Sequence, residues 1–280
     1  MLLSMETYVT CNLLGEETGL RLTAEAGFDA VDYNLFSDFG LTRLEEDYME
    51  KAARTKALLE KYGLLCNQAH GPFLFRYEHG DWTKSDLWRD MNRAIEYAAF
   101  LGAKQITFHP VNVPDGVDFV EYNLAYFRSF EPTARKFGIR IAVENGPARR
   151  VMRLVDRLDP EVFVYCVDTG HANNPPTWTA HEVIAQVPEG RLHALHLNDN
   201  WGVREGHWDL HFPPYYGSID WEAVLKALAQ RDYPGDFTLE IVGFLEHTPL
   251  ELYPQALGLA HAVGRKMIRK FEELKRGGTV

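Results

Sequence analysis

Short β-rich segments alternate with longer amphipathic segments along the whole chain. In the longer segments apolar residues recur with helical periodicity, whereas the shorter ones are rich in strand-forming residues. The pattern predicts eight strands, at residues 6–10, 29–33, 64–68, 105–108, 140–144, 162–168, 194–197 and 237–241. It predicts eight helices between and after them, at residues 16–26, 48–62, 84–101, 119–137, 148–158, 180–186, 221–229 and 254–275.

Capping residues support these boundaries. A glycine follows each of four predicted helices and precedes a strand, as a helix C-cap does: Gly27, Gly63, Gly102 and Gly138. Thr83 and Asp220 stand where the N-caps of two predicted helices belong. The alternation therefore rests on terminal signals as well as on periodicity.

Strict alternation of strands and helices, without a linker or a shift in composition, predicts one domain over residues 1–280. A closed (β/α)8 barrel and a doubly wound open sheet can both hold this pattern. The count of eight, and the absence of a GxGxxG motif after the first strand, favour the barrel. The expected fold class is α/β, a (β/α)8 TIM barrel.

Composition narrows the class of protein. The net charge of the 280 residues is −11, with 46% hydrophobic and 25% charged residues, as in an ordinary soluble protein. Nucleic-acid-binding proteins usually carry a basic face, which makes nucleic acid an unlikely partner here. The basic pairs Arg149-Arg150, Arg265-Lys266 and Lys275-Arg276 lie on predicted helices or the tail, where solvated charges are common.

The compartment follows from three further observations. Residues 1–6 (MLLSME) do not form a signal peptide, and no run approaches the roughly 18 apolar residues that span a membrane. Cys11, Cys66 and Cys166 are odd in number and lack CxxC spacing. They are expected to be buried thiols in a reducing compartment, which predicts a cytoplasmic protein without a membrane partner.

Residues with metal-ligand chemistry stand at six consecutive strand ends. In a (β/α)8 barrel the carboxyl ends of the strands meet at one face, where active sites are built. The nine residues occur in the motifs QAHGPF, ITFHP, IAVENG, VDTGH, LHLND, WDLHF and FTLEIV: His70, His109, Glu144, Asp168, His171, His196, Asp209, His211 and Glu240.

Each of these residues has an ordinary structural explanation when taken singly. A histidine at a strand end often hydrogen-bonds a loop, and a carboxylate there often caps a helix. Nine such groups at one barrel mouth are harder to explain, because carboxylates are rarely buried unless they are paired or bound to metal. A divalent cation would relieve the repulsion among them. A Glu, Asp and His ligand set suits Mn²⁺, Mg²⁺ or Co²⁺, with Zn²⁺ an alternative, and the additional histidines favour zinc and more than one ion.

Together these motifs resemble those of the xylose-isomerase-like TIM-barrel superfamily. The resemblance extends from GFDAVDYN to FTLEIV and rests on HGPF, FHP, VENG, DTGH, HLND, DLH…GSIDW and LEI as a series. The superfamily includes sugar isomerases and epimerases of the tagatose/psicose 3-epimerase kind, inosose-pathway enzymes, 3-dehydroshikimate dehydratases and type IV apurinic endonucleases.

In the epimerase-like members, the resemblance implies one divalent ion held by Glu144, Asp168, His196 and Glu240. Glu144 and Glu240 would also be the catalytic residues, which move protons on a sugar, or on a sugar-like polyol or keto compound, through an enediolate. His171 would hold substrate oxygens beside the metal. Weaker substrate-binding candidates are Arg204, Trp201, Trp208 and Phe73.

Alternatives remain open. The apurinic endonucleases match all nine positions with a three-zinc phosphodiesterase site, although the acidic chain and the loop GPFLFRYEHGDW argue against that function. A lyase or dehydratase could use the same site, and so could a non-catalytic metal- or sugar-binding barrel. Tyr215 and Tyr216 replace a Gly-acidic pair of many sugar-type relatives, which predicts a bulkier rim. Asp32 stands where relatives often have Glu, either touching substrate or capping a loop. Relatives are often homodimers or homotetramers.

Overall fold

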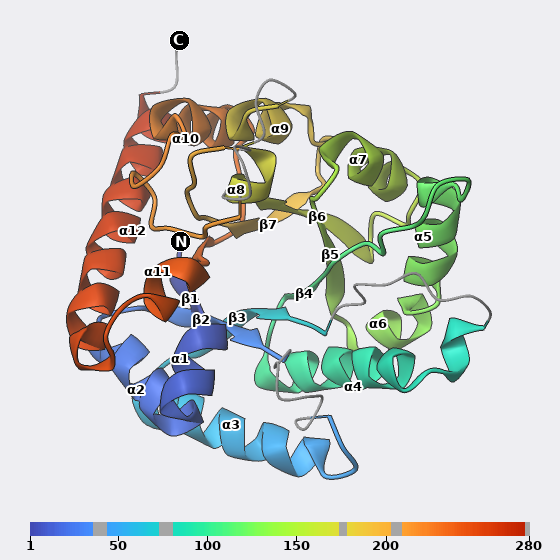
Figure 1. Cartoon of the computed structure of the whole chain (residues 1–280), viewed down its shortest axis with the longest axis horizontal. Helices are drawn as coiled ribbons and strands as arrows, with labels where there is room; N and C mark the ends of the chain where they lie inside the picture. Colours follow the sequence, from blue (N-terminus) through green and yellow to red (C-terminus); the bar gives the residue numbers. More distant parts are fainter. Residues whose placement is uncertain (36–43, 73–80, 174–177, 203–208, 278–280) are drawn as a thin grey trace.

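The structure, a computed structural model, describes residues 1–35, 44–72, 81–173, 178–202 and 209–277. Eight parallel strands form its centre, in the order β7-β6-β5-β4-β3-β2-β1-β8. A parallel bridge between Leu197 and Leu239 joins the two outer strands, so the sheet closes on itself into the predicted barrel (Figure 1). The strands are β1 (Leu3–Glu6), β2 (Ala30–Asn34), β3 (Leu65–His70), β4 (Gln105–Phe108), β5 (Arg140–Glu144), β6 (Phe163–Asp168), β7 (Leu192–His196) and β8 (Phe237–Leu239).

Helices surround the barrel and cover its outer surface (Figure 1). Their apolar faces pack against the strands, and the main hydrophobic core lies between the sheet and the helices. The helices are α1 (Tyr8–Leu14), α2 (Glu16–Glu25), α3 (Tyr48–Tyr62), η1 (Trp82–Lys84), α4 (Asp86–Leu101), α5 (Phe119–Arg128), α6 (Glu131–Phe137), α7 (Ala148–Asp156), α8 (Thr169–Ala172), α9 (Ala180–Gln186), α10 (Trp221–Gln230), α11 (Val242–Glu246), η2 (Leu250–Leu252) and α12 (Tyr253–Arg276).

The prediction for the first strand was wrong. The strand ends at Glu6, and the β-favouring run that follows it forms helix α1. The backbone N–H of Thr7 makes the last bond to β2, donating to the carbonyl of Asp32 (3.1 Å), before the chain turns into the helix. Helix α1 then packs on α2 at Gly19, where an added Cβ would lie 2.8 Å from the carbonyl of Thr10. Tertiary packing thus overrides local strand propensity.

Two helix predictions also change. The segment 119–137 is not one helix but two, α5 and α6, and Pro132 lies in the first turn of α6, where its missing N–H costs nothing. The N-cap of α4 is Ser85, whose side chain accepts from the N–H of Trp88 (3.1 Å), whereas Thr83 lies inside η1. Asp220 caps α10 as predicted, accepting from the N–H of Ala223 (3.0 Å).

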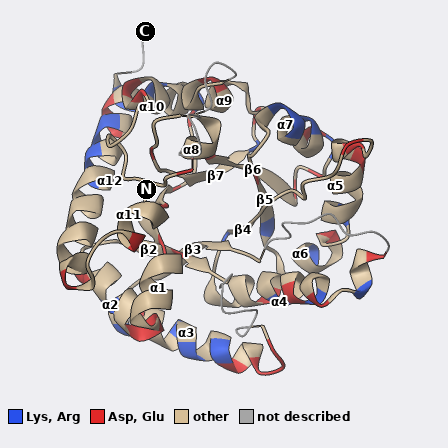
Figure 2. Cartoon of the chain, in the orientation of Figure 1, with Lys and Arg blue, Asp and Glu red and all other residues tan. Residues whose placement is uncertain are grey.

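Three predicted glycine C-caps are confirmed, because Gly63, Gly102 and Gly138 have left-handed backbone conformations after α3, α4 and α6. The basic pairs lie on α7 and α12, and Figure 2 shows Lys and Arg distributed over these outer helices. The three cysteines are buried free thiols. Within the described ranges, every helix is too short or too polar to cross a membrane.

Candidate metal centre

Alternation along the strands explains why ligand side chains point into the barrel. Side chains two residues apart on a strand lie on the same face. Inside the barrel, a small buried cluster is formed by Ala142, Val164, Cys166 and Ala194. Glu144, Asp168 and His196 each stand two residues beyond a member of this cluster, so they extend into the same interior, above a layer of small side chains.

Four residues form the centre of the site. One ligand atom from each of Glu144, Asp168, His196 and Glu240 lies within 4.8 Å of the others. The Nδ1 atom of His196 is 3.2 Å from Oε2 of Glu240 and 3.4 Å from Oε2 of Glu144. These three atoms are buried and have no hydrogen-bond partner. Because buried polar atoms without partners cost free energy, the arrangement fits a cation that all four residues would bind.

Asp168 caps helix α8 and also belongs to the candidate metal group. Its Oδ1 accepts from the backbone N–H of His171 (2.6 Å), as the N-cap of α8. Its Oδ2 accepts from the side chain of Asn198 (2.5 Å). Each carboxylate oxygen keeps a second lone pair, so these bonds orient the carboxylate for metal binding and do not prevent it.

His70 and His109 lie on one side of Glu144. The Nε2 atoms of His70 and His109 are 3.5 and 3.2 Å from Oε2 of Glu144, and 3.2 Å from each other. The Nδ1 of His70 donates to the carbonyl of Gly71 (3.0 Å). Both histidines therefore join the centre, as the strand-end pattern predicts.

His171, Asp209 and His211 lie on the other side. Oδ1 of Asp209 is 3.1 Å from Nε2 of His171 and 2.8 Å from Nε2 of His211. Asp168, His171 and His211 form a further group with ligand atoms within 4.8 Å of one another. The Nδ1 of His171 donates to the carbonyl of Asn145 (3.0 Å). All nine residues that the sequence singles out thus converge on one barrel mouth.

The two catalytic candidates have opposite electrostatic environments. Burial raises the pKa of Glu144, but His109 and His196 outweigh it and hold that pKa well below its usual range. Burial also raises the pKa of Glu240, to about 7, although His196 opposes the shift. In the metal-free protein one carboxylate is therefore ionised at neutral pH, and the other is poised between its two forms.

The histidines show that the centre favours positive charge. Burial lowers the pKa of His70, but the nearby carboxylate of Glu144, 3.5 Å away, raises it to about 9. Burial likewise lowers the pKa of His211, and Glu240 and Asp209 together raise it to about 10. His109 differs, because burial lowers its pKa to about 4. In the metal-free protein, protons on His70 and His211 therefore supply part of the positive charge that a metal ion would supply.

A family profile described as "Xylose isomerase-like TIM barrel" matches residues 20–262. The chain belongs to this family. The solved structure of a D-tagatose 3-epimerase-like protein covers 99% of both chains with a TM-score of 0.74 at 18% identity. The IolI protein with a bound zinc covers 97% of this chain and 98% of its own (TM-score 0.72, 15% identity). The 3-keto-D-glucoside 4-epimerase YcjR of E. coli covers 95% and 99% (TM-score 0.72, 16% identity).

Among curated proteins, the uncharacterized protein y4fM of Sinorhizobium fredii is 26% identical over 278 residues, covering 85% of this chain and 83% of its own. At these identities the solved structures establish the barrel fold, and the chemistry must be argued from this chain's own residues.

The sequence pattern missed Gln68 and Glu6, and it assigned two other roles to Asp32. Asp32 neither touches an open substrate space nor caps a loop: it is fully buried, and its Oδ2 lies 2.9 Å from Nε2 of His196. Gln68 donates to the same oxygen (2.6 Å). Glu6, at the end of β1 in register with Asp32, is a further buried acid, and burial with the charge of Glu240 raises its pKa to about 8. The misplaced first strand concealed Glu6, because the prediction put it at the beginning of that strand.

The substrate-contact candidates have mixed outcomes. Trp201 is 56% exposed and its ring lies 5.5 Å from that of Phe212. Phe73, Arg204 and Trp208 lie outside the described residues. Tyr215 and Tyr216 are exposed: Tyr215 packs beneath the ammonium of Lys266 on α12, and Tyr216 beside Phe244 on α11. Part of the aromatic bulk is therefore directed to the outer helices.

Proposed function

We propose that this protein is a divalent-metal-dependent isomerase or epimerase of a sugar, or of a sugar-like polyol or keto compound. The observation that carries the proposal is the pair of Glu144 and Glu240, whose unpartnered oxygens lie 3.4 and 3.2 Å from Nδ1 of His196. Glu144, Asp168, His196 and Glu240 would hold the ion. Their mixed oxygen and nitrogen donors suit Mn²⁺, Mg²⁺, Co²⁺ or Zn²⁺, and the zinc of the IolI structure supports zinc among these.

When bound, the ion would polarise a carbonyl and the hydroxyl beside it, which acidifies the C–H bond between them. Glu144, as a carboxylate, would remove the proton. Glu240, in its protonated form, would return one. Return to the opposite face of the same carbon gives epimerisation, and return to the neighbouring carbon gives aldose–ketose isomerisation. His171 would orient substrate oxygens from its place beside Glu144 (Nδ1 to Oε1, 3.2 Å).

The family membership and two epimerase-related structures support this reaction class. The proposed partner is accordingly a small carbohydrate-like molecule and not a nucleic acid. Assembly as a homodimer or homotetramer and a cytoplasmic location belong to the same proposal.

One observation favours a second candidate, a multi-zinc phosphodiesterase. Asp168, His171 and His211 form a second group with metal-binding geometry, and Asp209 bridges its two histidines. Three ions could occupy a centre of this kind. A lyase that uses the proton-abstraction half of the proposed reaction is a further alternative, and its substrate would carry a leaving group β to the acidified carbon.

Two measurements on the purified protein test the proposal. Elemental analysis should find about one divalent ion per chain, whereas about three would favour the phosphodiesterase. Incubation with a panel of ketoses and 3-keto sugars in deuterated water should introduce deuterium at a carbon beside the carbonyl. No deuterium in any sugar, together with about three ions per chain and phosphodiester cleavage, would overturn the isomerase assignment.

A further inference from the structure

We infer that Asp32 is a positioning residue that fixes His196 in the tautomer and orientation in which Nδ1 faces the metal. The inference rests on the proposed metal centre and deepens it. Sequence reasoning left Asp32 between substrate contact and loop capping, and the structure places it in neither position. The hydrogen bonds around Asp32 lead instead to the ligand ring.

The contacts of Asp32 carry the first step. Its Oδ2 lies 2.9 Å from Nε2 of His196 and accepts from Nε2 of Gln68 at 2.6 Å. A carboxylate can only accept, so the bond to Asp32 requires a proton on Nε2 of His196. The side-chain amide nitrogen of Gln68 also lies 2.9 Å from this ring nitrogen, and it directs a hydrogen to Asp32. In the metal-loaded protein the proton on Nε2 leaves the lone pair of His196 on Nδ1. That is the atom surrounded by oxygens of Glu240 and Glu144, at 3.2 and 3.4 Å.

The surroundings of the ring carry the second step. His196 and Asp32 are both fully buried, so water does not compete for their bond. The ring of His70 stacks on that of His196, with centroids 5.5 Å apart and planes 16° apart. Stacking limits tilting of the ring, but it does not determine which nitrogen faces the metal. Asp32 supplies that choice, as carboxylates do behind histidine ligands of metal sites.

Position on the strands explains why Asp32 cannot serve the substrate directly. Asp32 lies in the middle of β2, two residues before its end, and pairs in register with Gln68 and with Glu6. His196 stands between Asp32 and the carboxylates of the centre. Asp32 therefore acts on the metal only through His196.

The test is metal affinity, measured by calorimetric titration of the metal-free full-length chain with Mn²⁺ or Zn²⁺. Asp32→Asn keeps the size of the side chain and removes its charge, and it should weaken binding by about 10- to 100-fold. With Co²⁺, the visible absorption bands should shift, because they report the ligands around the ion. The matched control is Asp90→Asn, which alters a buried aspartate on α4 that pairs with Arg89 and belongs to none of the candidate metal groups, and it should leave affinity and spectrum unchanged.

A double-mutant cycle shows whether the effect passes through His196. In a His196→Gln background, adding Asp32→Asn should weaken binding by less than about twofold. If Asp32→Asn fails to fold, Gln68→Met continues the test, because it removes the second donor to Asp32 and the amide nitrogen that lies 2.9 Å from Nε2 of His196. Gln68→Met should weaken binding by a few-fold with His196 present, and not in its absence.

Two results would overturn this inference and leave the proposed metal centre standing. One is a folded Asp32→Asn variant that binds metal as tightly as wild type. The other is an Asp32→Asn substitution that weakens metal binding equally in the wild-type and His196→Gln backgrounds. A wild-type chain that binds no divalent ion would overturn the proposed centre as well. The outcomes do not depend on finding the sugar, so failure of this inference and failure of the proposed reaction are distinguishable.

Discussion

Buried and half-buried carboxylates occur at both ends of the barrel, and their surroundings differ. At the amino end, Asp29 accepts from the N–H of Leu3 and from the guanidinium of Arg265, each at 2.7 Å. Asp236 accepts from the N–H of Leu2 at 2.9 Å and from Lys104 at 3.2 Å. Each oxygen of these two carboxylates has a donor, and the bonds join chain segments far apart in sequence.

At the carboxyl end, Glu144 and Glu240 each bury an oxygen that has no donor. The nearest polar atoms are ligands of the same kind, crowded within a few ångströms. Carboxylates with complete sets of donors stabilise a fold, whereas incomplete sets in a crowded cluster fit the proposed cation site. The comparison separates structural acids from functional ones without reference to a relative.

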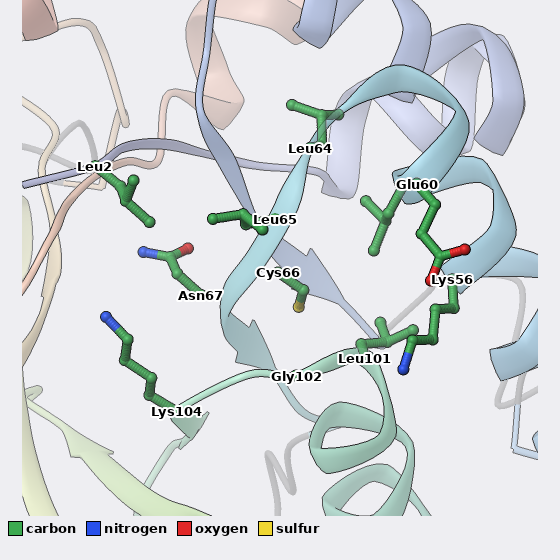
Figure 3. Close-up of a pocket in the computed structure, with 11 residues that line it drawn as sticks. Leu2, Lys56, Glu60, Leu64, Leu65, Cys66, Asn67, Leu101, Gly102 and Lys104 are labelled. Carbon is green, nitrogen blue, oxygen red and sulfur yellow. The ribbon is translucent and has the colours of Figure 1, made fainter.

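A cavity alone does not make this distinction. The amino end holds a cavity of about 260 Å³ between α3, β3 and α4, with Leu59, Leu64 and Leu101 among its walls (Figure 3). Its charged lining residues are Lys56, Glu60 and Lys104, which do not form a ligand cluster. All of the candidate metal-binding groups found in the described part of the chain lie at the opposite mouth.

The largest effect is expected from Glu240→Gln. The substitution removes a proton-transfer group and a metal ligand, so kcat/KM, or deuterium exchange where the substrate is unknown, should fall by about 10²- to 10⁴-fold. The control is Asp236→Asn at the amino end, which should retain exchange. Equal losses in the two variants would mean that the ends do not differ in function.

A smaller effect is expected from removing the ion. Because an ion that binds only the folded state stabilises it, metal at 100 times its Kd should raise the free energy of unfolding by about 2.7 kcal/mol. Thermal unfolding with and without a chelator measures this gain. Glu144→Gln should lose most of it, and Asp236→Asn should keep it. A chelator that changes wild type and Glu144→Gln alike would contradict a centre at the carboxyl end.

The sequence specified some parts of this picture better than others. Strands β4 and β5 have the predicted bounds, because Gly102 and Gly138 end the preceding helices shortly before them. The nine candidate residues converge as predicted because parallel strands in a barrel end at one face. The strand bounds follow from local glycine caps, and the convergence of the nine residues follows from the general geometry of the barrel.

The parts that failed depend on contacts between distant segments. Thr7 makes the last bond of β1 to Asp32, 25 residues away, and the local β-favouring run beyond it gives no sign of that stop. The bond between Asp32 and His196 joins β2 to β7, which are 164 residues apart at these two positions. No local pattern in the sequence encodes a contact at that separation.

The smallest effect is expected from Asp29→Asn, which tests the structural end. Burial raises the pKa of Asp29, but hydrogen bonds from Arg265 and the N–H of Leu3 outweigh it and hold the pKa below its usual range. A lowered pKa contributes stability above the unfolded-state value of about 4, and the contribution disappears as pH falls through the folded-state value. The free energy of unfolding of wild type at pH 7 should therefore be higher than that of Asp29→Asn by about 1 kcal/mol. The difference is this small because the ion pair of Asp29 with Arg265 is partly exposed.

Urea denaturation at pH 7 and at successively lower pH measures this difference, which should shrink below pH 4. Metal affinity of Asp29→Asn should equal that of wild type, because Asp29 lies at the opposite end of the strands from the centre. If Asp29→Asn weakens metal binding as much as Asp32→Asn does, buried aspartates would affect the site through general loss of stability. The bond between Asp32 and His196 would then not explain the loss of metal affinity in Asp32→Asn. The acids at the two ends of the barrel would differ in the size of their effect and not in its kind.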